Sequence, residues 1–122
     1  MLPDRGAIMG GRPGPIQRRA DFEAYPWEDL PRRYWAEARP RFEALRAAMP
    51  PGMKAIGGIG NGPFELAEDL VGLEYLPLLE ADDPELFADL FARIGAYLES
   101  LWTSLLADYA DLFVGCRIGD DL

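Results

Sequence analysis

Two short apolar segments, the first of them bounded by glycines, constrain the fold of this chain most. They cover residues 53–59 and residues 112–118, and we expect the first to form a buried strand and the second a further apolar strand. About 50 residues with mainly helical periodicity separate them, which predicts a parallel β–α–β crossover. In the second strand, alternation places four side chains on one face: Leu112, Val114, Cys116 and Ile118.

Helix signals lie on both sides of the first strand. A tight turn at residues 60–63 leads into a predicted helix over residues 64–72, with Pro63 in its first turn and Gly72 as the stop. Before the strand, residues 28–39 and 41–48 have helical periodicity, and Pro40 predicts a break or kink between them.

The clearest helix begins at residues 82–85, where an aspartate cap precedes a proline and a glutamate. Its apolar side chains recur at helical spacing over about 25 residues, which predicts a core-facing stripe rather than a cofactor site. The stripe consists of Leu86, Phe87, Leu90, Phe91, Ile94, Leu98, Leu101, Trp102, Leu105, Leu106 and Tyr109.

The chain of 122 residues is too short for a complete (β/α)₈ barrel, which needs roughly 250 residues. Eight of the eleven prolines lie in residues 1–51. We therefore expect residues 1–20 to form an irregular arm and residues 21–122 to form the packed α/β part. A two-stranded parallel sheet leaves both edges open, so this architecture is expected to be part of something larger.

Composition excludes several kinds of chemistry. The chain has no histidine, which rules out a Ser–His–Asp triad, a Cys–His pair and any zinc site with histidine ligands. Its single cysteine cannot form an internal disulfide and suits a reducing compartment. No apolar run approaches the roughly 20 residues of a membrane span, and no signal-peptide pattern begins the chain. We expect a cytoplasmic protein that does not contact a membrane.

The charge is divided unevenly along the chain. Residues 1–54 contain ten basic and seven acidic side chains, whereas residues 55–122 contain two basic and fourteen acidic ones. The acidic half repels phosphate backbones, and no stretch of the first half is densely basic. Nucleic acid is therefore not an expected partner.

Ligands of parallel α/β folds bind at the carboxyl ends of the strands, which directs attention to two positions. After the first strand, residues 60–65 include Asn61 and Phe64 beside glycines that let backbone approach a ligand. The alternative is an ordinary turn. After the second strand come Asp120 and Asp121. One of them could accept hydrogen bonds from a ligand, bind a metal or act as a general base, or it could cap a loop.

Two further residues of the second strand are unusual in type. Arg117 stands within an apolar segment, where it either pairs with a nearby carboxylate or contacts an anion. Cys116 has no histidine to activate it, and we expect it to be a small buried apolar residue.

Four motifs, in order and at similar spacing, resemble the uroporphyrinogen decarboxylase superfamily from about residue 20 to the end. They are Asp-Phe-Glu-Ala-Tyr-Pro-Trp at 21–27, Gly-Pro-Phe-Glu at 62–65 followed by Gly-Leu at 72–73, Asp-Asp-Pro-Glu-Leu at 82–86, and Ile-Gly-Asp-Asp-Leu at 118–122. The resemblance implies a segment covering roughly the middle third of a (β/α)₈ barrel.

The resemblance also implies an activity for the parent protein. The decarboxylase of this family removes the acetate carboxyls of uroporphyrinogen without a cofactor, whereas its corrinoid methyltransferases use zinc. By this resemblance Asp69 lies where the decarboxylase has a tyrosine, and Asp120 where it has a substrate-contacting serine. The Gly-Asp-Asp ending is more similar to the methyltransferase branch. The family's catalytic Asp precedes the matched region, and its essential His follows it.

We therefore expect a fragment of a decarboxylase-like barrel enzyme that is inactive alone and has no cofactor of its own. Its parent would bind a tetrapyrrole or a corrinoid-type small molecule, with zinc and corrinoid only in a methyltransferase-like parent. The alternatives are a fragment of a cobalamin-dependent methyltransferase and a non-enzymatic α/β module. If the chain folds alone, we expect a homo-oligomer that associates through the exposed strand edges.

Overall fold

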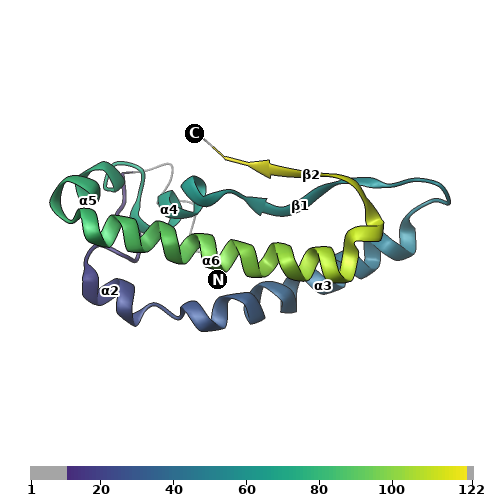
Figure 1. The fold of residues 1–122 in the computed structure, drawn as a ribbon, viewed down its shortest axis with the longest axis horizontal. Helices are drawn as coiled ribbons and strands as arrows, with labels where there is room; N and C mark the ends of the chain where they lie inside the picture. Colours follow the sequence, from purple (N-terminus) through teal and green to yellow (C-terminus); the bar gives the residue numbers. More distant parts are fainter. Residues whose placement is uncertain (1–10, 121–122) are drawn as a thin grey trace.

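The structure, a computed structural model, describes residues 11–120 and has an α/β architecture dominated by helices. Figure 1 shows the two strands running above the long helix α6, with α3 below it. The elements in chain order are α2 (Arg19–Ala24), η1 (Trp27–Asp29), α3 (Leu30–Ala48), β1 (Ala55–Asn61), α4 (Pro63–Val71), α5 (Leu76–Asp82), α6 (Pro84–Tyr109), η2 (Ala110–Leu112) and β2 (Phe113–Gly119).

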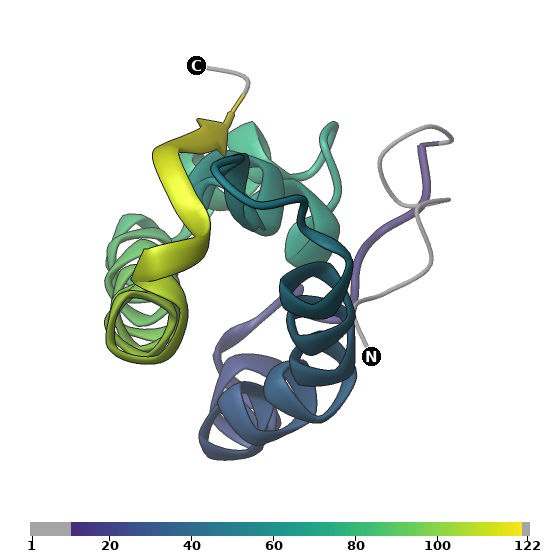
Figure 2. The same cartoon turned by 90° about the vertical axis from the view of Figure 1, so that its right-hand side faces the viewer.

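The two strands pair in parallel, which confirms the predicted crossover. Gly57 lies opposite Cys116 and Asn61 opposite Gly119, with irregularities in the register between them. The prediction that residues 53–59 form a buried strand is wrong, since no residue of β1 is buried, and no residue of β2 is buried either. In Figure 2, α3 and α6 lie on the same side of the strands. Among residues 11–120 no second layer covers the other side, which explains the exposure.

Alternation along β2 separates a packed side from a bare one. Phe113 packs against the aromatic cluster around Trp35 and Tyr109. The residues that alternate with it, Val114 and Ile118, are 72% and 61% exposed. Cys116 lies between them and is exposed as well. The prediction of a buried cysteine is therefore wrong, because β2 turns this side away from the helices.

Helix α6 matches its predicted start and length. The Asp83 side chain accepts a hydrogen bond from the Leu86 backbone N–H at 2.9 Å, and Pro84 occupies the first turn. This is the arrangement that satisfies free amides at a helix start. Most of the predicted stripe packs inward, although Leu106 is 54% exposed.

Helix α3 runs without interruption through Pro40, so the predicted break is wrong. A proline inside a helix deprives the carbonyl four residues earlier, here that of Ala36, of its usual donor. Both Pro40 and Ala36 are exposed. Water can therefore solvate that carbonyl, which lowers the cost of continuing the helix.

Helix α4 ends at Gly72, whose φ of 101° suits glycine. The end of this helix is covered by residues 11–18, which form no helix or strand. The Ile16 N–H donates to the Leu70 carbonyl at 2.9 Å, and the Gln17 side chain donates to the Val71 carbonyl at 2.7 Å. Ile16 is fully buried, so part of the predicted irregular arm belongs to the core.

The core has two clusters of buried side chains. One joins α4, α5 and the first half of α6, and the other joins α3, the second half of α6 and η2. Tyr97 packs against both clusters. The elements α2 and α5 were not predicted.

Candidate functional site

The carboxyl end of the sheet is organised around Asp120. One of its carboxylate oxygens accepts from the Glu65 N–H at 2.9 Å, and the other accepts from the Phe64 N–H at 3.1 Å. Both amides belong to the first turn of α4, where free N–H groups and the helix dipole favour a negative charge. A residue that follows β2 therefore caps the helix that follows β1.

Gly62 lies directly beneath this cap. Its N–H donates to the Gly119 carbonyl at 2.6 Å, which extends the contact between the two strand ends. A Cβ atom built on Gly62 would lie 2.5 Å from Cγ of Asp120, which is closer than real Cβ contacts. Glycine at this position is what allows the Asp120 carboxylate to reach the helix start.

The other candidate residues lie at different places. Asn61 is half-buried at the end of β1, and Phe64 packs partly buried against the core. Asp69 is 4% exposed within α4 and forms part of the buried helix face. Arg117 is exposed on β2 and makes no ion pair with any residue of 11–120. Asp121 lies outside the described residues.

The structure therefore brings Asn61, Phe64 and Asp120 together at one end of the sheet. It places Asp69 in the core and leaves the Arg117 guanidinium on the surface. Two surface cavities of about 290 and 330 Å³ are lined by none of these residues. The larger cavity lies between α3 and β1, beside Tyr34 and Gly58.

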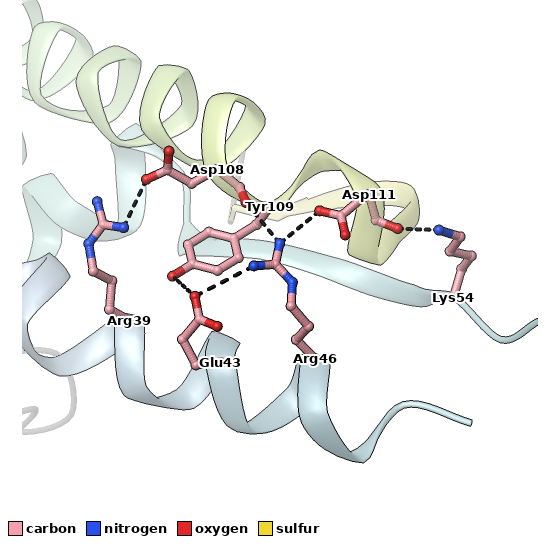
Figure 3. Close-up of polar contacts among 7 residues, drawn as sticks. All are labelled: Arg39, Glu43, Arg46, Lys54, Asp108, Tyr109 and Asp111. Carbon is pink, nitrogen blue, oxygen red and sulfur yellow. Dashed lines mark hydrogen bonds and ion pairs between the residues drawn. The ribbon is translucent and has the colours of Figure 1, made fainter. Parts of the chain in front are cut away.

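A second polar cluster, which the sequence did not reveal, lies at the amino ends of the strands (Figure 3). The Arg46 guanidinium donates to the Asp108 carbonyl at 2.9 Å and to the Asp111 carboxylate at 2.8 Å, and it lies 5.0 Å from the centre of the Tyr109 ring. The cluster consists of Arg39, Glu43, Arg46, Lys54, Asp108, Tyr109 and Asp111.

This amino-end cluster holds the last turns of α3 against the corner between α6 and β2. Arg39 pairs with Asp108 at 2.9 Å, and Lys54 donates to the Asp111 carbonyl. The spacing of Arg39, Glu43 and Arg46 along one side of α3 is the only signal that sequence reasoning could have used. In parallel barrels this end of the strands contributes stability, whereas the opposite end carries the chemistry.

Three pKa shifts move tyrosine or aspartate side chains away from neutral pH. Burial, followed by the neighbouring Tyr34 and Tyr25, raises the pKa of Tyr97 to about 12. Burial and the hydrogen bond to Glu43 raise the pKa of Tyr109. Hydrogen bonds from Arg32 and Arg33 lower the pKa of Asp29. None of these groups is adjusted to exchange a proton near pH 7, as a general acid or base would be.

Within residues 11–120, no three His, Cys, Asp or Glu side chains lie close enough to share a metal ion. No helix in this part is both long and apolar enough to cross a bilayer.

Comparison with known proteins found no matching family model, no matching curated protein and no matching solved structure.

Proposed function

We propose that the chain is a segment of a (β/α)₈-barrel enzyme of the uroporphyrinogen decarboxylase kind, in which it supplies two neighbouring strands to a tetrapyrrole-binding barrel. The observation that supports this most is the sidedness of the parallel pair. Helices cover one side, whereas Val114 and Ile118 are 72% and 61% exposed on the other. Strands of such barrels have helices outside and branched apolar side chains filling the interior.

Parallel sheets are normally buried on both faces, which is a second argument for further strands. In the proposed barrel, the bare side of β2 would face the interior. The turn between β1 and α4 would lie at the mouth, where ligands of these barrels bind.

Within the proposal, Asp120 is a positioning residue for this mouth. Its carboxylate holds the Phe64 and Glu65 amides, and so it fixes the turn that contains Asn61. Arg117 alternates with Cys116 and Ile118 along β2 and so lies on the helix side of the strand, outside the proposed barrel interior. In this proposal the segment carries no catalytic residue. The enzyme to which it belongs is proposed to be cytoplasmic.

A corrinoid methyltransferase parent is the second candidate, based on the Gly-Asp-Asp sequence at 119–121. Such an enzyme needs zinc. The residues present do not fit a zinc site, because the chain has no histidine and residues 11–120 hold no cluster of three possible ligands.

The reading frame of the transcript beyond the codon for Leu122 tests the proposal. A frame that continues into further strand–helix units with a histidine supports a decarboxylase parent. A His-x-Cys pair and a later cysteine would instead favour the methyltransferase. A stop codon at this point contradicts both. The purified chain of 122 residues is expected to form no coproporphyrinogen from uroporphyrinogen. Measurable product would contradict the proposal that this segment carries no catalytic residue of its own.

A further inference from the structure

The carboxyl end of α4 is covered closely by residues 11–18, which we call the strap. The Gly14 N–H donates to the Val71 carbonyl at 2.8 Å, and the Ile16 N–H donates to the Leu70 carbonyl at 2.9 Å. Both carbonyls lie in the last turn of the helix, where intrahelical donors are missing. A Cβ atom built on Gly14 would collide with the Leu70 carbonyl oxygen, so glycine is what allows the strap to approach α4 this closely.

The Gln17 side chain fastens the strap to the helix. Its amide nitrogen donates to the Val71 carbonyl of α4 at 2.7 Å. The same nitrogen lies 3.0 Å from the Gly14 and Ile16 carbonyls of the strap itself. Gln17 is an exposed residue, so its replacement removes these polar contacts without opening a cavity in the core.

Helix α4 is too short for its two ends to be independent of each other. It has nine residues, whereas isolated helices of fewer than about 12 residues are marginal in water. Each helical N–H donates to the carbonyl four residues earlier, so the amides at 68–71 bond the carbonyls at 64–67. No middle turn therefore separates the end that the strap covers from the end that Asp120 caps.

A single row of hydrogen-bonded peptide groups connects the two ends of α4. The row consists of the peptide groups that join residues 70–71, 67–68 and 64–65. The Ile16 N–H of the strap donates to the carbonyl of the first group. The Asp120 carboxylate accepts from the N–H of the last group, that of Glu65, at 2.9 Å. Hydrogen bonds in such a row polarise one another, so the strap and the cap act on the same row.

We propose that docking of the strap and formation of the Asp120 cap are coupled through α4. Release of the strap then loosens the first turn of α4, and with it the turn at the carboxyl ends of the strands. Because such coupling is reciprocal, loss of the cap also loosens the strap. A cleavage within residues 11–18 thus changes the candidate site without touching it. The inference goes beyond the proposed barrel function and does not depend on it.

Amide hydrogen exchange, measured by NMR on the whole chain, tests the coupling from the strap to the cap. Gln17→Ala should accelerate exchange of the Phe64 and Glu65 amides about fivefold, the effect of one lost hydrogen bond. Arg18→Ala is the matched control, since the neighbouring Arg18 side chain is 79% exposed and pairs with Asp21 at 3.6 Å. This variant should leave both amides unchanged.

Tyr109→Phe separates the coupling from a general loss of stability. It also removes one hydrogen bond, to Glu43, but at the amino ends of the strands. The Phe64 and Glu65 amides should exchange in this variant as they do in the native chain. Faster exchange in Gln17→Ala alone would therefore reflect opening of α4 rather than of the whole fold.

The reverse direction is measured with Asp120→Ala, which should accelerate exchange of the Gly14 and Ile16 amides that donate to α4. Urea denaturation then completes a double-mutant cycle. Gln17→Ala combined with Asp120→Ala should lose less stability than the sum of the two single losses, because fraying from one end already removes bonds at the other. Gln17→Ala combined with Tyr109→Phe should be additive.

Three results would overturn the inference. They are unchanged exchange of the Phe64 and Glu65 amides in Gln17→Ala, equal acceleration of these amides in Tyr109→Phe, and additive losses of stability when Gln17→Ala is combined with Asp120→Ala. None of them bears on the reading frame that tests the barrel proposal, so the two ideas fail separately.

Discussion

The Tyr109 hydroxyl donates a hydrogen bond to the Glu43 carboxylate at 2.9 Å and so joins the end of α6 to α3. The Tyr109 ring is 1% exposed and stacks on Phe42 at a centroid distance of 4.9 Å. The Glu43 side chain is 57% exposed, so the bond runs from the core to the surface. It is the point where the amino-end cluster is anchored in the core.

Replacing Tyr109 by Phe should lower the free energy of unfolding by about 1 kcal/mol, because it removes one hydrogen bond while the exposed carboxylate regains water. Urea denaturation measures this difference. Tyr75→Phe is the matched control, since the Tyr75 hydroxyl has only a long, exposed contact of 3.4 Å to the Gly11 carbonyl. The control should change stability by less than about 0.5 kcal/mol. Equal losses in the two variants would contradict the anchoring role of Tyr109.

Replacing Asp120 by Ala should cost about 1 kcal/mol, the usual effect of removing a helix cap. Both carboxylate oxygens hold backbone amides of α4, so hydrogen exchange of the Phe64 and Glu65 amides should become faster. Asp82→Ala provides the control, because Asp82 is exposed and is the last residue of α5, a different helix. Unchanged exchange of the two amides in Asp120→Ala would show that the cap does not form in solution.

Replacing Gly62 by Ala should destabilise the chain by about 1–3 kcal/mol, the typical cost of overpacking. The added methyl group would lie 2.5 Å from Cγ of Asp120, so the cap must move or the strand end must shift. Gly115→Ala is the control, since its methyl group would enter open space. If Gly62→Ala is as stable as Gly115→Ala, the close approach of Gly62 and Asp120 is not required.

Local signals in the sequence were sufficient to predict helix ends that are set by the residues at those ends. The cap at Asp83, the proline at position 84 and the glycine at position 72 predicted where α6 begins and where α4 ends. Two separated apolar segments predicted the parallel pair. These features depend on helix capping, backbone dihedral angles and strand connection rules, all of which act over short stretches or follow from topology.

The burial of a residue by segments that are distant in the sequence could not be predicted. Cys116 is exposed because no described layer lies over its side of β2, whereas Ile16 is buried because it packs on the end of α4. At the candidate site, the sequence placed an aspartate at a strand end. It could not show that both oxygens of Asp120 serve a helix 55 and 56 residues earlier in the chain. Contacts of this kind exist only after the elements have packed.

The stability of the fold should decrease at alkaline pH because of its half-buried tyrosines. The pKa of Tyr97 is raised to about 12, whereas an unfolded chain has a tyrosine pKa near its ordinary value of about 10. Between these pH values the folded chain retains a proton that the unfolded chain has lost. The free energy of unfolding therefore falls as the pH rises from about 10 to 12. Burial raises the pKa of Tyr25 and Tyr34 in the same direction.

Urea denaturation at a series of pH values measures this decrease, and absorbance of the phenolate at alkaline pH reports the titration itself. Tyr97→Phe should make the decrease shallower, because it removes the tyrosine that packs against both core clusters. Its stability below about pH 9 serves as the reference for lost packing, since tyrosines remain protonated there. A pH dependence identical to that of the native chain would mean that Tyr97 ionises in the folded protein as readily as in the unfolded one, and that its burial does not disfavour the phenolate.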